Sequence, residues 1–218
     1  MIHSRLAMTL GEAIFTQRSI RRFRPDPVPI ADLELIVAAA SKAPSGGNSQ
    51  IARFLAVNDP GLIREFGALY REAWWAKRRD AEGWTGPDDL NAAERAQWAP
   101  SMRLADEMGG VPCVVFALSV PPNAEGSVLP ATQNLMLAAR ALGIGSVPTT
   151  LHSSVEGRFR EMFGIPPEVK FHFAIPLGYP AGNFGPTKRR PTWETSYLNR
   201  WEGTVPWAPG EAADGPAS

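Results

Sequence analysis

The sequence predicts one α/β or α+β domain in which helices form layers against a central sheet. Along the 218 residues, helical patterns outnumber strand patterns and the two kinds alternate. One continuous apolar run, residues 111–120, is typical of a strand buried on both faces. A chain of this length buries roughly 70% of its unfolded surface, which is enough for one sizeable core.

The N-terminal part predicts two helices followed by a strand. Thr9 and Glu12 have the spacing of a capping box, so a short helix starts near Leu10 and delivers the next polar segment at its end. Residues 30–42 repeat apolar side chains at helical spacing, and the proline and glycines that follow end this second helix. Residues 51–57 then form a strand.

The middle of the chain predicts a helix over residues 62–79 and then a polar stretch, residues 81–100, that glycine and proline interrupt. Within that stretch, residues 88–98 have the pattern of a short helix. Four tryptophans, at positions 74, 75, 84 and 98, lie in or beside it. They either pack this segment onto the core or form a wall that stacks on an aromatic substrate.

The second half predicts a central helix, one more short helix and a last strand. The central helix has a consistent inner stripe, formed by Leu135, Ala138, Ala139 and Leu142. Ser153 and Glu156 have capping-box spacing and open a helix through Phe163. Residues 171–177 are the last clear strand, because glycine and proline are too frequent beyond them for a long element.

Bulk composition excludes several classes of protein. The 22 basic and 22 acidic residues balance, whereas non-specific nucleic-acid binding needs a strong positive field. No apolar run approaches the roughly 20 residues of a membrane span, and the first ten residues lack the apolar core of a secretory signal. The single cysteine, Cys113, lies in an apolar run, which is typical of a reducing compartment. We therefore expect a cytoplasmic protein.

The three histidines do not indicate a metal site. His3, His152 and His172 are far apart in sequence, and no cysteine or carboxylate stands near them at ligand spacing. The pair Gly143 and Gly145 is not a dinucleotide fingerprint either, because the third glycine and the preceding strand are missing. We expect no metal ligand and no Rossmann unit.

Two polar segments, residues 17–23 and 43–50, indicate a cofactor. Arg18 and Ser19 offer a guanidinium fork and a hydroxyl, which suit a phosphate. The second segment offers backbone and side-chain amides, which suit the polar edge of a planar heterocycle. The phosphate-binding segment and the segment that would bind the ring lie about 25 residues apart and are joined by one helix. Among nucleotide-like cofactors, this pair is most compatible with FMN. The alternatives are a solvated basic surface and an ordinary helix-ending loop.

These segments resemble the nitroreductase family of FMN-dependent oxidoreductases. The resemblance consists of Arg-Ser-x-Arg at residues 18–21 followed by Ala-Pro-Ser-Gly-x-Asn-x-Gln at residues 43–50. Residues 131–146 are similar to the family's central helix and its glycine exit. Residues 177–180 and then 188–191 resemble its last core strand and the basic residue that returns to the phosphate.

The resemblance implies a nitroreductase-like fold, with a central mixed, mostly antiparallel sheet flanked by helices. It implies a homodimer with FMN in the interface and exchanged C-terminal arms. Residues 1–209 would form one domain, in which about 67–110 are a variable lid or insertion and about 192–209 are the dimer-wrapping arm. That arm carries tryptophans in a segment too broken by glycine and proline to fold alone. Residues 210–218 would be a mobile tail.

The resemblance also implies a role for particular residues. Arg18 and Ser19 hold the phosphate together with Arg189, and Arg21 lies near flavin N1 and the C2 carbonyl, whereas Arg22 points the other way. Gln17 stands where the family has a basic residue. Thr149 is the candidate that tunes N5 by a hydrogen bond. The full set of expected cofactor-binding residues is Arg18, Ser19, Arg21, Pro44, Ser45, Gly46, Asn48, Gln50, Val147, Pro148, Thr149 and Arg189.

The implied activity is an FMN-dependent oxidoreductase that passes hydride from NADH or NADPH through N5 to nitro-aromatic, quinone or similar electron-poor acceptors. No side chain acts as nucleophile, because the flavin carries the chemistry. Other flavin reactions on the same fold are alternatives: reductive dehalogenation, azoline oxidation and flavin fragmentation. The Glu, Tyr and Lys lid of the family's iodotyrosine deiodinases has no counterpart at convincing spacing here. A non-catalytic flavin-binding protein is the alternative from another class.

Overall fold

The computed structural model describes residues 4–120 and 125–209. The chain divides into two compact units, residues 1–186 and 187–218. The predicted mobile tail, residues 210–218, lies outside the described residues. The helices of the first unit are α1 (Leu10–Thr16), α2 (Ile30–Ala40), α3 (Pro60–Glu82), α4 (Ala92–Glu107), α5 (Glu125–Ala141) and α6 (Glu156–Phe163). Its strands are β1 (Ala52–Val57), β2 (Cys113–Ser119), β3 (Gly145–Ser146) and β4 (Lys170–Gly178).

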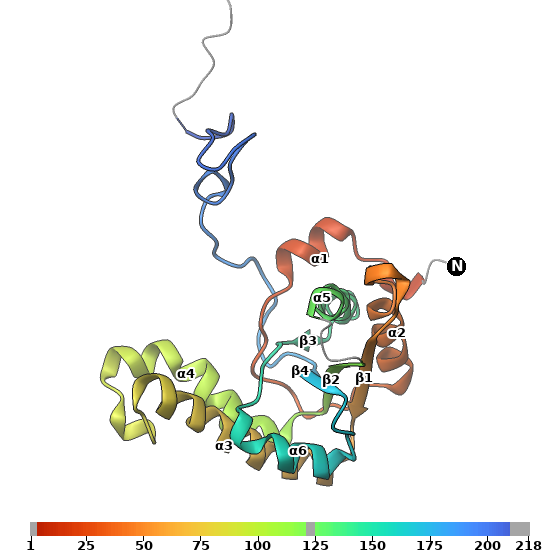
Figure 1. Ribbon diagram of the computed structural model, residues 1–218, viewed down its shortest axis with the longest axis vertical. Helices are drawn as coiled ribbons and strands as arrows, with labels where there is room; N and C mark the ends of the chain where they lie inside the picture. Colours follow the sequence, from red (N-terminus) through yellow and green to blue (C-terminus); the bar gives the residue numbers. More distant parts are fainter. Residues whose placement is uncertain (1–3, 121–124, 210–218) are drawn as a thin grey trace, which may run out of the picture. The chain divides into compact units, whose positions relative to one another are not determined.

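The four strands form one sheet in the order β1-β2-β4-β3, and every neighbouring pair is antiparallel (Figure 1). A parallel bridge joins Ser19 to Ser146 at the β3 edge. Helices lie on both faces of the sheet, with α2 and α5 on one face and α3 and α6 on the other. The predicted α+β class, with a mixed, mostly antiparallel sheet flanked by helices, is confirmed.

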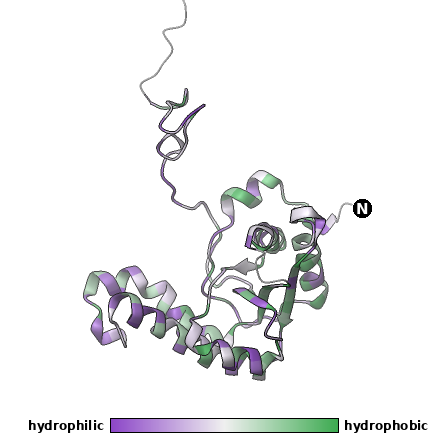
Figure 2. Ribbon diagram, in the orientation of Figure 1, coloured by the Kyte–Doolittle hydropathy of each residue, from purple (hydrophilic) through white to green (hydrophobic). Residues whose placement is uncertain are grey.

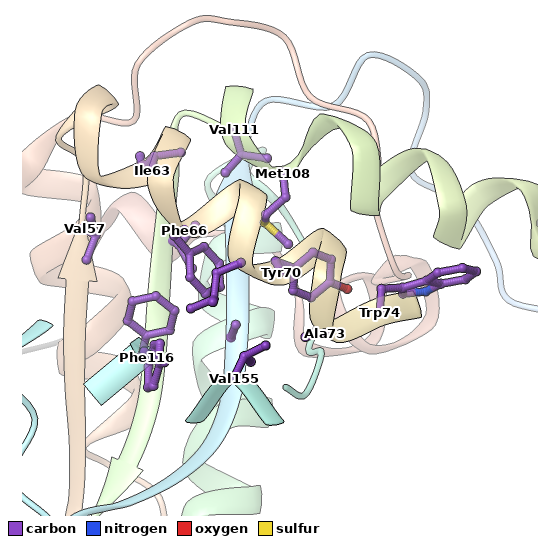
Figure 3. Packing of buried hydrophobic residues seen from close by; sticks show 14 of the residues in the cluster. Val57, Ile63, Phe66, Tyr70, Ala73, Trp74, Met108, Val111, Phe116 and Val155 are labelled. Atoms are coloured by element: carbon purple, nitrogen blue, oxygen red, sulfur yellow. The ribbon is translucent and has the colours of Figure 1, made fainter. Parts of the chain in front are cut away.

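Strand β2 supplies both cores, and all seven of its residues are buried as the continuous apolar run predicts. Successive side chains point to opposite faces, so they alternate between two hydrophobic clusters. On the α3 and α6 face, Phe116 meets Phe66 edge-on with ring centroids 4.9 Å apart. Figure 3 shows both residues within this cluster. Figure 2 shows mostly hydrophobic residues along β1 and α2, whereas polar and apolar residues alternate along α3 and α4.

Helix α5 confirms the predicted central helix and its glycine exit. Leu135, Ala138 and Ala139 are buried against α2 and the sheet. The chain leaves the helix at Gly143, whose φ of 74° is the left-handed conformation that glycine tolerates. The amide of Ile144 donates to the carbonyl of Ala139 at 2.8 Å, which closes the last turn and directs the chain into β3.

Helices α4 and α6 differ from the sequence prediction. The short helix predicted over residues 88–98 begins at Ala92 and continues through Pro100 to Glu107, because packing of its second half against α3 outweighs the missing proline donor. Ser153 does not cap α6, since it lies in a 3-10 turn and the ring of His152 accepts the amide of Ser154 instead. That capping assignment was wrong, although the helix itself is present.

The tryptophans join α3 to α4. Trp74 packs edge-on against Trp75 and Trp98, with ring centroids 4.7 Å and 6.3 Å away. The guanidinium of Arg78 lies over the ring of Trp98, 4.4 Å from its centroid. These rings therefore contact one another and a cation between two antiparallel helices. No helix among residues 4–120 and 125–209 combines the length and the apolarity that crossing a membrane requires.

The C-terminal unit, described as far as residue 209, is built around one ring contact. Tyr197 and Trp201 pack with centroids 4.6 Å apart, and the amide of Leu198 donates to the carbonyl of Gly203 at 3.1 Å. Large apolar side chains remain open to solvent, with Trp201 exposed by 78% and Trp207 by 52%. Its one short element is the 3-10 turn Thr192–Glu194.

Candidate functional site

Four arginines converge on one hollow of about 370 Å³, which we call the arginine pocket. It is lined by Arg18, Ser19, Arg21 and Arg22 of the N-terminal segment and by Arg103 of α4. Within the described residues, none of these four guanidinium groups forms an ion pair with a carboxylate. Four uncompensated cations around one cavity are a site for anionic oxygens.

The buried side chain of Ile20 fixes the N-terminal side of this pocket. Its amide donates to the carbonyl of Ser146 at 3.0 Å, and a Cβ on Gly145 would lie 2.8 Å from the Ile20 side chain. Glycine at this position therefore lets the segment lie directly against β3. Two residues further on, the carbonyl of Arg22 accepts the amide of Ala181 at 3.0 Å. Arg22 lines the same pocket as Arg18. That its side chain points away from the phosphate stays a prediction.

The segment at residues 44–50, which we call the glycine loop, lines a second hollow of about 560 Å³. Pro44, Ser45, Asn48 and Gln50 all face that hollow. The hydroxyl of Ser45 accepts the amide of Gln50 at 2.8 Å, and the amide of Gly46 donates to the Ser127 hydroxyl at 3.3 Å. The loop is thus closed on itself and tied to the start of α5.

Three residues of the glycine loop have left-handed backbone conformations. The φ angles are 58° at Gly47, 54° at Asn48 and 51° at Gln50. Glycine and asparagine tolerate this region, whereas a glutamine in it is strained. Gly46, the residue for which close approach to a ring was expected, has no positive φ, so the conformational freedom is used one residue later. Strain of this kind is concentrated at binding sites in proteins.

The expected cofactor residues of the two polar segments therefore line two different hollows within one chain. The arginine pocket and the hollow of the glycine loop share no lining residue. The β-bridge between Ser19 and Ser146 instead places residues 17–23, the segment expected to bind phosphate, beside the residues that follow β3. The two polar segments, which are close in sequence, therefore line separate hollows in one chain.

The residues after β3 are held by the sheet and by α3. Val147 is buried in the core. Thr149 forms an isolated bridge with Ala174, with hydrogen bonds of 2.9 Å and 2.7 Å. Its hydroxyl lies 2.7 Å from the hydroxyl of Tyr70, whose ring Figure 3 shows projecting from α3. Burial raises the pKa of Tyr70, while the nearby Arg21 and the Thr149 bond oppose that rise.

Two more side chains of α3 hold the same loop, and the sequence did not indicate them. The ammonium of Lys77 donates to the carbonyl of Thr150 and, at 2.7 Å, to its hydroxyl. Burial and the adjacent Arg78 lower the pKa of Lys77 to about 8. One carboxylate oxygen of Asp80 lies 2.9 Å from Nε2 of His152. One face of α3 carries all three side chains, Tyr70, Lys77 and Asp80. Their helical spacing was the only feature of the sequence that could have indicated that they act together.

Arg189 belongs to the C-terminal unit. Its guanidinium donates to the carbonyl of Lys188 at 3.0 Å within that unit. The side chain is exposed and forms no ion pair with the described carboxylates. It is therefore available to an anion, as a phosphate ligand must be.

Known proteins resemble this chain over most of its length. The sequence model of the Nitroreductase family matches residues 14–179. An NADH dehydrogenase of Thermus thermophilus is 32% identical, over 82% of this chain and 90% of the relative. An iodotyrosine deiodinase of Thermotoga neapolitana is 30% identical, over 75% and 84%. A 5,6-dimethylbenzimidazole synthase of Rhodobacter capsulatus is 28% identical, over 88% and 94%.

Two solved structures show the same fold. An iodotyrosine deiodinase bound to FMN and 3-iodo-L-tyrosine superposes with a TM-score of 0.66 at 24% identity, covering 84% of this chain and 94% of that one. A nitroreductase of Desulfitobacterium hafniense with bound FMN gives a TM-score of 0.64 at 21% identity, covering 91% and 100%. With the family match over residues 14–179, these findings give one conclusion: the chain belongs to the nitroreductase family.

Proposed function

We propose that this protein is an FMN-dependent oxidoreductase that passes hydride from NADH or NADPH to nitro-aromatic, quinone or similar electron-poor acceptors. One observation carries the proposal. The uncompensated Arg18 and Arg21 lie beside the loop after β3, because Ser19 pairs with Ser146. Cationic groups for a phosphate and for an electron-rich ring edge thus come from one short segment.

The donor set of the arginine pocket fits the cofactor's phosphate. Arg18 offers a bidentate fork and Ser19 a hydroxyl, and both are exposed to the hollow. Arg189 of the C-terminal unit would complete this set. No acid competes for these groups among the described side chains, so an anion gains their full charge.

The part of the site that would hold the flavin ring depends on the fixed charge of one arginine and on the backbone after β3. When bound, FMN supplies an N5 atom that accepts and donates hydride. The guanidinium of Arg21 supplies a positive charge that would favour negative charge at the N1 edge. Thr149 holds its backbone in the bridge to Ala174, and its hydroxyl is oriented by Tyr70. A hydroxyl fixed in this way is a suitable partner for N5.

The separation of the two hollows supports a homodimer in which each site takes residues from both chains. The glycine loop of one protomer would read the ring edge of the cofactor held by the other protomer's Arg18 and Arg21. Helix α1 presents an apolar surface for such an interface, with Leu10 exposed by 70% and Phe15 by 74%. The exposed tryptophans of the C-terminal unit would be buried on the partner as exchanged arms.

Residues 1–209 then act as one domain, in which 67–110 include a variable lid and 192–209 form the arm. A cytoplasmic location belongs to this proposal and is supported by the single buried thiol of Cys113. Two relatives are named iodotyrosine deiodinase and 5,6-dimethylbenzimidazole synthase. Their reactions are therefore the alternatives to the proposed activity.

A spectrum of the purified protein tests the proposal. We expect a yellow protein whose flavin absorbance bleaches under nitrogen on addition of NADH or NADPH and returns on addition of a nitro-aromatic or a quinone. Bound flavin that neither nicotinamide reduces would favour one of the rival reactions or a flavin carrier. A colourless protein that does not take up added FMN would contradict every flavin-based function.

A further inference from the structure

The arginine pocket holds more positive charge than the proposed cofactor neutralises. Four guanidinium groups line it, at Arg18, Arg21, Arg22 and Arg103. A phosphate monoester carries about −1.5 to −2 charges at neutral pH. About two of these four positive charges therefore remain after the phosphate is bound. Like charges held together without an anion destabilise a site, so a second anionic group fits here.

Arg22 and Arg103 are the two groups that the cofactor does not require. Arg21 also lines a neighbouring hollow with Asp106 and Glu107, so acidic groups stand on its other side. Asp106 and Glu107 also lie one turn along α4 from Arg103, but the Asp106 carboxylate is paired with Arg71 of α3 at 2.6 Å, and neither acid forms an ion pair with Arg103 in the described structure. Both Arg22 and Arg103 are exposed to the pocket and have no described carboxylate partner.

The wall beside Arg103 is apolar and small. Ala99 and Pro100 of α4 line the pocket one turn before the arginine, and Asn183 also lines it. A ligand with an apolar or planar body and one anionic group matches this surface, because the body covers Ala99 and Pro100 while the anion reaches the two guanidinium groups.

We propose that Arg22 and Arg103 bind an anionic oxygen group of the molecule that reacts with the cofactor. The group is a phosphate or a carboxylate, supplied either by the 2′-phosphate of NADPH or by an acidic aromatic acceptor. This inference rests on the proposed function, since it assigns the substrate class of the same site. Binding by these two arginines makes the protein prefer an anionic electron donor or acceptor to a neutral one of the same shape.

Calorimetry on the FMN-loaded protein tests the selectivity without electron transfer. The probes are 4-nitrobenzoate against 4-nitrobenzyl alcohol, and adenosine 2′,5′-bisphosphate against AMP. We expect the anionic member of at least one pair to bind more tightly to the wild type. Selectivity in the first pair alone identifies an acidic acceptor, and selectivity in the second alone identifies NADPH.

Arg103→Ala should weaken binding of the selected anionic probe by about ten- to a hundredfold, the range for one hydrogen bond to a charged group. Binding of its neutral or less charged counterpart should change less than twofold. Arg103→Lys should retain part of the selectivity, and Arg22→Ala should reproduce the loss in a variant outside α4. Arg64→Ala is the charge-matched control, because Arg64 is exposed on α3 outside this pocket.

Three results would overturn the inference. The first is a wild type that shows no preference in either probe pair. The second is a preference that survives in both Arg103→Ala and Arg22→Ala. The third is a loss of FMN affinity in Arg103→Ala as large as in Arg18→Ala, which would assign Arg103 to the cofactor. Failure of the proposed function is distinguishable, because flavin that no nicotinamide reduces can coexist with an intact binding preference.

Discussion

The hydroxyl groups of Tyr70 and Thr149 lie 2.7 Å apart although 79 residues separate them in the chain. This contact joins α3 to the loop after β3, whose backbone is already bonded to Ala174 of β4. Burial raises the pKa of Tyr70, so its hydroxyl keeps its proton throughout the neutral range. The loop is therefore held from the sheet side and from the helix side at the same residue.

Tyr70→Phe should lower the free energy of unfolding by about 1 kcal/mol, because it leaves the Thr149 hydroxyl without its partner. Urea denaturation at pH 7 measures the change. Tyr179→Phe is the matched control, since no hydrogen bond of the Tyr179 hydroxyl is found among the described residues, and its effect should stay within about 0.5 kcal/mol. Equal effects of the two substitutions would show that the contact with Thr149 contributes nothing.

Lys77 should make stability rise with pH between about 8 and 10.5. Burial holds its pKa at about 8, below its ordinary 10.5, so in this window the unfolded chain binds the extra proton. Unfolding measured at pH 7, 8 and 9 should therefore show wild type gaining stability relative to Lys77→Met. Above pH 9 the buried Cys113, whose pKa is raised to about 12, acts in the opposite direction. Parallel pH profiles of the two proteins would contradict the assignment.

Arg18→Ala should weaken FMN binding by about 1.5–3 kcal/mol, the range for a hydrogen bond to a charged group. Fluorescence titration of the apoprotein with FMN measures this. Riboflavin lacks the phosphate, so its affinity should change much less, and that difference separates a phosphate contact from a general disturbance of the site. An unchanged dissociation constant for FMN would remove Arg18 from the phosphate site.

Gly67→Ala should destabilise the fold by about 1–3 kcal/mol, because the new methyl group would overpack a close crossing. A Cβ at Gly67 of α3 would lie 2.3 Å from the N and Cα atoms of Gly109, just after α4. Gly157→Ala on α6 meets nothing within 4 Å and should instead stabilise its helix by about 0.5–1 kcal/mol. Chemical denaturation of both variants checks the opposite signs.

Truncation after Arg190 should convert the protein to monomers and release FMN together. The deleted residues carry Trp193, Trp201 and Trp207, which are exposed by 40%, 78% and 52% in one chain. Burying each such ring on a partner is worth roughly 1.5–3 kcal/mol or more, so its loss weakens association. Sedimentation and flavin absorbance measure the two effects. A truncated dimer that keeps wild-type FMN affinity would show that the arm is dispensable.

Elements with strong local signals could be predicted from the sequence. The hydroxyl of Thr9 accepts the amide of Glu12 at 3.1 Å, and α1 begins at Leu10 as that spacing predicts. The apolar run of β2 is buried throughout, and the left-handed Gly143 ends the central helix. In each case the residues that determine the structure lie within a few positions of one another.

Other features depend on distant parts of the chain and had no local signal. Pro100 indicated an end to α4, yet burial of Leu104 and Ala105 against neighbouring elements keeps the helix continuous. Strand β3 has only two residues and exists because β4 and Ser19 pair with it. The same reason applies to the site: Arg103 joins the N-terminal arginines through tertiary packing alone.

The three contacts from α3 to the loop after β3 also set where the length of this chain can change. Tyr70, Lys77 and Asp80 hold that loop along about 15 Å of helix, at 1.5 Å per residue. Inserting or deleting one residue between Tyr70 and Lys77 would turn the rest of α3 by about 100° and carry the two later side chains away. Insertions between residues 83 and 91, beyond the helix, leave all three in place. Differences in length among members of this family should therefore be concentrated between residues 83 and 91.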